Sequence, residues 1–298
     1  ALTLTQGSGA NVVIAAGQTK IVATDGAGSG AIVYEMDDLE LAGNLTVAGV
    51  LDVDGTANLD VIDVDGAANF AADVTFADGA DIITASAGTS NLRLGVNAGN
   101  SIASGGNYNT VVGDEAGTAI TTGDLMTAVG YKALFTEDTG ERSTAVGAFA
   151  LTAQNAAVEN YNTAVGYAAG TAVTTGIRNT LIGGLAGDAL TTSDYNVAVG
   201  YNAVTSATTG NSNSALGRQA LKSTTTGSQN VAVGRDALEA NTSASNNTAV
   251  GFHALVANTT AENNTAIGKD ALKANTTAGT NTAVGALSLD ANTTGDQL

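Results

Sequence analysis

The chain has 298 residues, with 28 Asp and Glu against 10 Lys and Arg, a formal net charge of −18, and no cysteine. This balance argues against a nucleic-acid partner, because phosphate contacts need clustered Lys and Arg, and the missing cysteines exclude disulfides and thiolate metal sites. No apolar run approaches the length of a membrane span, so we expect no membrane insertion.

Residues 1–90 form the first predicted region, an acidic shaft or attachment segment with thirteen Asp or Glu against one basic residue, Lys20. Short alternating runs separated by glycine, at 44–49, 50–55 and 61–66, predict short strands. Strands of this length bury too little surface alone, so we expect several chains to intertwine in a triangular β-prism. Residues 30–42 are predicted to form a brief helix or a junction.

Two pairs of carboxylates in this region, Asp52/Asp54 and Asp63/Asp65, each lie on one face of a predicted strand and precede a glycine. Hard-cation binding is one interpretation. The glycine comes too early for an EF-hand loop and the distal Glu is absent, so we favour a solvated strand face. We therefore predict no metal and no cofactor.

Residues 91–298 form the second predicted region, a tandem array whose ideal 17-residue unit reads N-T-A-V-G-x-x-A-L-x-A-N-T-T-G-x-x. Units this small must stack on their neighbours to bury a core, so the array predicts a β-solenoid of about twelve coils. The first glycine of the unit recurs at Gly95, Gly113, Gly130, Gly147, Gly166, Gly183, Gly200, Gly217, Gly234, Gly251, Gly268 and Gly285.

The alternation around position three of the unit predicts a short strand with two faces. We expect the Val, Ile or Leu at position four to face the core. Position three is Ala in most copies, and we expect this Ala column to lie against a sister subunit; the alternative is a small filler residue. Ala at position eight and Leu at position nine should add to the core. The Asn at position one should form a ladder from coil to coil, although Met126 and Ser143 interrupt it.

The remaining chemistry is sparse. His253, the only histidine, occupies the variable seventh position and is predicted to lie on the surface. We find no residue set for a Ser-His-Asp or His-metal site, so we predict no catalytic, cofactor-binding or metal-binding residues and no enzymatic activity. A carbohydrate-degrading tailspike is the least favoured class, although carboxylate pairs formed between chains stay an open alternative.

The N-T-A-V-G-x-x-A-L-x-A-N-T-T-G array, with the upstream L-T-V-A-G and L-D-V-D-G phrases of residues 44–66, resembles tail-fibre proteins of marine and cyanobacterial phages. The array is also similar to the head of trimeric autotransporter adhesins, which carry a comparable V-A-I-G segment. Both resemblances imply an all-β, parallel homotrimeric fibre. Residues 1–298 contain no segment that resembles the secretion signal, coiled-coil stalk or membrane anchor of the adhesin family.

We therefore expect a structural virion fibre, on the tail or the capsid, that projects from the particle and supports host attachment. A bacterial surface adhesin or extracellular filament is the alternative. The expected partners are two further copies of the chain, other tail or capsid proteins, and a host surface glycan or protein receptor. Leu298 closes a repeat without a capping sequence, so we expect more protein or another chain to follow.

Overall fold

The computed structural model describes residues 2–4, 12–14, 22–24, 33–35, 86–156 and 159–298. The chain divides into two compact units, residues 1–75 and residues 76–298. The predicted strands within 44–66 and both Asp pairs lie outside the described residues.

Four short strands are described in the first unit. β1 (Leu2–Leu4) pairs antiparallel with β2 (Val12–Ile14), and β3 (Val22–Thr24) pairs antiparallel with β4 (Val33–Glu35). The helix predicted as one option for residues 30–42 is wrong for β4, which is extended and paired.

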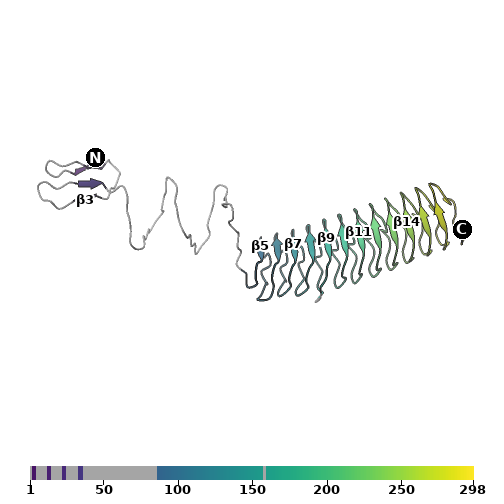
Figure 1. The fold of residues 1–298 in the computed structure, drawn as a ribbon, viewed down its shortest axis with the longest axis horizontal. Coiled ribbons are helices and arrows are strands. Elements are labelled where there is room, and N and C mark those ends of the chain that lie inside the picture. Colours follow the sequence, from purple (N-terminus) through teal and green to yellow (C-terminus); the bar gives the residue numbers. More distant parts are fainter. Residues whose placement is uncertain (1, 5–11, 15–21, 25–32, 36–85, 157–158) are drawn as a thin grey trace. The chain divides into compact units, whose positions relative to one another are not determined.

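The second unit is a parallel β-solenoid in which twelve strands stack in chain order (Figure 1). These strands are β5 (Leu92–Leu94), β6 (Thr110–Val112), β7 (Thr127–Val129), β8 (Thr144–Val146), β9 (Thr163–Val165), β10 (Thr180–Ile182), β11 (Val197–Val199), β12 (Ser214–Leu216), β13 (Val231–Val233), β14 (Thr248–Val250), β15 (Thr265–Ile267) and β16 (Thr282–Val284). The prediction of an all-β solenoid is confirmed for the array.

Each repeat makes one coil, because equivalent residues of successive repeats pair directly. Thr248 pairs with Thr265 and Val250 pairs with Ile267, which is a step of one 17-residue unit. Because one coil runs from each strand to the next, the twelve strands enclose about eleven full coils. At about 4.8 Å per strand spacing, the eleven steps give a sheet roughly 50–55 Å long.

The predicted orientation of the strands is wrong. The Ala residues of position three are 0–1% exposed and belong to the solenoid's own core, whereas Leu216 and Val284 at position four are 51% and 67% exposed. The buried Ala residues are Ala128, Ala145, Ala164, Ala198, Ala215, Ala232, Ala249, Ala266 and Ala283. The core holds Ala on this side because Leu side chains fill it from position nine. The Ala column therefore cannot contact a sister subunit.

The rest of the core agrees with the prediction. Leu221, Leu238, Leu255 and Leu272 at position nine are fully buried, and so are the Ala residues of position eight that precede them. These Leu residues have positive φ values, for example 51° at Leu238. A left-handed backbone costs an L-residue roughly 1–2 kcal/mol. Full burial of a Leu side chain contributes about 1.5–3 kcal/mol, which offsets that cost.

The predicted asparagine ladder is present along the core. In the coil that begins at Asn247, the side-chain Oδ1 accepts a bond from the Asn264 amide at 2.9 Å. Its Nδ2 donates to the Ala261 carbonyl at 2.9 Å, so the side chain joins two segments of the coil stack. Where Met126 replaces Asn, its backbone N–H still donates to Asn109 Oδ1, and its side chain fills the buried space.

The turn at the N-T-T-G segment of the unit, which we name the return turn, is also held from coil to coil. The Thr242 hydroxyl donates to the Thr259 carbonyl at 3.1 Å, and the Thr259 hydroxyl repeats this bond to Thr276. A second asparagine ladder runs beside it, in which Asn275 Nδ2 donates to Asn258 Oδ1 at 3.1 Å. The polar segment of the unit therefore also links successive coils.

Glycine at position five is required by both conformation and space. Gly234 has φ +133°, and a Cβ there would lie 2.6 Å from the Gly251 carbonyl oxygen of the next coil. The column of glycines thus sets how closely successive coils approach each other.

Candidate functional site: an exposed sheet face and a charged row

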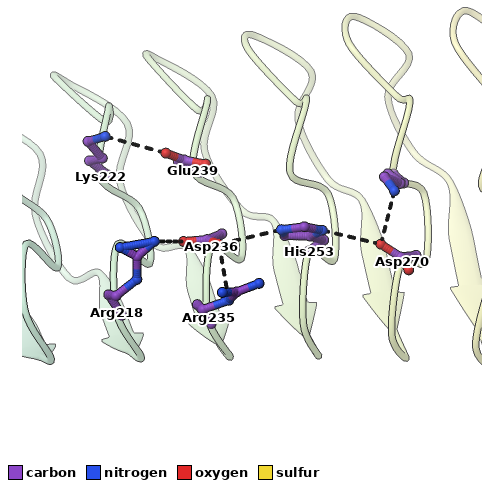
Figure 2. Close-up of polar contacts among 8 residues, drawn as sticks. Arg218, Lys222, Arg235, Asp236, Glu239, His253 and Asp270 are labelled. Carbon is purple, nitrogen blue, oxygen red and sulfur yellow. Dashed lines mark hydrogen bonds and ion pairs between the residues drawn. The ribbon is translucent and has the colours of Figure 1, made fainter.

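The packing of the solenoid does not account for two features of its surface. The first is the outward side of the twelve-stranded sheet, formed by positions two and four, which we name the sheet face. The second is a set of charged side chains and one histidine near the C-terminal end of the array, which we name the charged row. Arg218, Arg235, Asp236, His253 and Asp270 belong to it (Figure 2), and so do Lys269 and Lys273.

The sheet face carries an apolar stripe along its length. Position four is Val, Ile or Leu in every strand from β5 to β16, and all twelve side chains reach the surface. The most exposed members of the stripe are Leu94, Val165, Ile182, Leu216, Ile267 and Val284, at 37–67% exposure.

Exposed tyrosines border the stripe on both sides. Six of the seven tyrosines of the chain lie in the N-terminal part of the array, each two residues before or after a strand. They are Tyr108, Tyr161 and Tyr195 before the strands, and Tyr131, Tyr167 and Tyr201 after them, all 41–60% exposed.

Neighbouring side chains hold several of these rings. Phe149 meets Tyr131 and Tyr167 edge to face, with ring centroids 5.2 and 5.9 Å apart. Arg178 Nη1 donates to the hydroxyl of Tyr195 at 2.8 Å, and its guanidinium lies 5.4 Å from the ring centroid. The border of the sheet face is therefore ordered as well as exposed.

The charged row is built on the turns that follow strands β12 to β15, where equivalent positions of successive coils lie side by side. Asp236 is the first centre, and its side chain is only 8% exposed. Its carboxylate lies 3.3 Å from Arg235 Nε, 3.4 Å from His253 Nε2 and 3.9 Å from Arg218 Nη2.

Asp270 is the second centre, with a side chain 7% exposed. Its carboxylate lies 3.2 Å from Lys269 Nζ, 3.4 Å from Lys273 Nζ and 3.4 Å from His253 Nδ1. Burial acts to raise the pKa of this carboxyl, but hydrogen bonds and charge from Lys269 and Lys273 outweigh burial, so the pKa lies below its usual value.

His253 lies between the two carboxylates, and its side chain is 27% exposed. The prediction of a simple surface residue is therefore incomplete, because both ring nitrogens face a buried Asp. The ring also stacks on Phe252 at 3.6 Å, and Arg235 lies 4.3 Å above the Phe252 ring. Nε2 lies 3.4 Å from the Asp236 carboxylate and Nδ1 lies 3.4 Å from the Asp270 carboxylate. The 17-residue spacing of Asp236, His253 and Asp270 could have revealed this row from the sequence.

Other chemistry is limited in the part of the chain that the structure describes. No group of three or more His, Asp or Glu residues there could hold a metal ion. Glu137 is fully buried but is bonded to the Gly140 amide and to the side-chain amides of Gln154 and Asn160. Among the same residues, no helix is long and apolar enough to cross a membrane.

Comparison with known proteins adds no relative: no family model, no curated protein and no solved structure matches the chain.

Proposed function

We propose that the chain is a subunit of a non-enzymatic, homotrimeric fibre that projects from a virion and supports host attachment. The observation that carries the proposal is the sheet face. An apolar stripe that continues over about 50 Å of strand stacking is unusual on a monomeric soluble protein, and such patches mark contacts with other molecules.

Copies of the same chain are the partner that fits a surface with this period. When copies lie in parallel and in register, every coil of one meets the equivalent coil of another, so one contact repeats along the whole array. Closed cyclic symmetry then buries all the stripes around one axis. The resemblance of the repeat to trimeric phage fibres and adhesin heads supports three copies.

The composition of the sheet face supports a contact between proteins. Tyrosine and arginine are enriched at such interfaces, and Tyr161, Tyr195 and Arg178 border the stripe. We therefore assign the subunit contact to the sheet face in place of the Ala column, because the Ala residues are buried inside the solenoid.

A bacterial surface adhesin or extracellular filament is the second candidate, favoured by the similarity of the array to adhesin heads. The genes beside this one separate the two candidates. Tail and capsid genes support the virion fibre, whereas secretion and anchor genes support the adhesin.

Light scattering of the full chain tests the assembly. We expect the mass of three chains, and we expect Val233→Arg together with Ile267→Arg to give monomers, because these changes bury unpaired charge in the contact. Thr260→Arg is the matched control, since Thr260 is exposed on the return turn and should leave the mass unchanged. A wild-type mass of one chain at all concentrations would refute the trimer.

A further inference from the structure

The charged row is a local concentration of positive charge in an acidic protein. Five of the ten Lys and Arg residues lie on the turns after β12 to β15, namely Arg218, Lys222, Arg235, Lys269 and Lys273. The carboxylates on the same turns are Asp236, Glu239 and Asp270, so five cations against three carboxylates leave a net charge of +2 before His253 is counted. Glu262 lies on the return side of its coil.

The acidic side chains of the row are buried, whereas the basic side chains are exposed. The Asp236 and Asp270 side chains are 8% and 7% exposed, whereas those of Arg235, Lys269 and Lys273 are 52%, 63% and 50% exposed. A ligand that approaches the turns therefore meets ammonium and guanidinium groups. The carboxylates lie beneath these groups and hold them in place, which reduces the conformational cost of binding.

The overall charge of −18 does not determine the potential at this surface. Exposed charges are largely screened beyond about 10 Å at 0.1 M salt. The row spans three strand steps, or about 14 Å, so a bound group interacts mainly with the row itself. Because the electrostatic attraction acts only over this short range, a partner must carry anionic groups spaced along the row.

We propose that the charged row binds a linear polysaccharide that carries carboxylates along its chain, a polyuronate. Arg235 and Arg218 offer planar donors that match a carboxylate in pairs, and Lys269 and Lys273 add point charges farther along the row. Phe252 stacks against His253 and lies under the Arg235 guanidinium, and these contacts help to hold Arg235 in the row. This inference depends on the proposed attachment function and assigns a ligand class to it.

Calorimetry with hexagalacturonate and the full chain tests the site. We expect binding at low salt, and we expect Arg235→Gln with Lys269→Gln to weaken it by about tenfold or more. Lys132→Gln with Arg142→Gln is the matched control, because it changes the net charge equally at a distant part of the array; it should alter the Kd by less than about twofold.

Three results would overturn the inference. They are no binding of hexagalacturonate, an equal loss in the control variant, and equally tight binding of a single-stranded oligonucleotide. Thermal melting of each variant separates lost binding from lost folding, and the single variant Lys269→Gln, at an exposed side chain, serves if the double variant unfolds. Light scattering of the same samples distinguishes the two proposals. A monomer that binds the uronate refutes only the trimer, and a trimer that does not bind it refutes only this site.

Discussion

Replacing Asn247 by leucine tests the asparagine ladder, which is the main polar element of the core. The change removes the acceptor for the Asn264 amide and the donor for the Ala261 carbonyl, both at 2.9 Å in buried surroundings. Each buried group left without a partner costs about 1–3 kcal/mol. The Ala261 carbonyl keeps a second donor, Asn258 Nδ2 at 3.0 Å, so the Asn264 amide is the group left without a partner. The predicted loss is therefore about 1–3 kcal/mol, of which the added apolar surface recovers part.

Urea unfolding monitored by circular dichroism measures the loss, and hydrogen exchange at the Asn264 amide shows whether it is local. The array should remain folded, because the chain already tolerates Met126 at this position. Asn246→Leu is the matched control. Asn246 is exposed with φ 61°, and Leu125 occupies the equivalent position at φ 59°, so we expect a change below about 0.5 kcal/mol. Equal stability of the two variants would show that the ladder contributes nothing.

Three further predictions follow from burial, backbone geometry and titration. Leu238→Ala should lower the free energy of unfolding by about 2–5 kcal/mol, measured by urea titration, whereas Val250→Ala, at the partly exposed position four, should cost a single chain less than about 1 kcal/mol. Gly234→Ala should lower Tm more than Gly285→Ala. Both glycines have positive φ, but only at Gly234 would a new Cβ lie 2.6 Å from an atom of the next coil. Equal losses of Tm would exclude close stacking of the coils as the cause. Burial raises the pKa of Asp188 despite its backbone hydrogen bonds, so the ionised carboxylate destabilises the fold at neutral pH. Asp188→Asn should therefore raise Tm there, and the advantage over wild type should shrink as pH falls through the raised pKa; an advantage independent of pH would contradict this.

The 17-residue period is enough to predict the coils and the ladder between them. It does not predict which face of each strand is buried, because that depends on how side chains pack across the coil. The 17-residue spacing correctly indicates one coil per repeat, and Asn at position one correctly indicates the ladder. Alternation at positions two to four correctly indicates two faces, but nothing in it says which face is inside. The usual expectation that Val is buried and Ala is incidental fails, because Leu238 and its equivalents enter the core from the opposite side and leave room only for Ala232.

The candidate site was missed for a related reason. When the repeats are aligned, the seventh position holds many residue types, and such variation indicates a surface position for His253. In the fold, residues 17 apart are neighbours, so the relevant comparison is between adjacent side chains. Asp236, His253 and Asp270 then form one continuous row, in which each ring nitrogen of His253 lies 3.4 Å from a carboxylate oxygen.

The coil geometry has a consequence under load. The bonds between coils run along the axis of the array while the strands lie across it, so an axial force acts directly on the interstrand bonds. One coil contributes about 4.8 Å of rise but contains 17 residues, which span about 55–60 Å when extended. Each coil that opens therefore releases roughly 50 Å of chain without breaking a covalent bond, so that a subunit pulled from its ends would lengthen stepwise and dissipate energy before it detached.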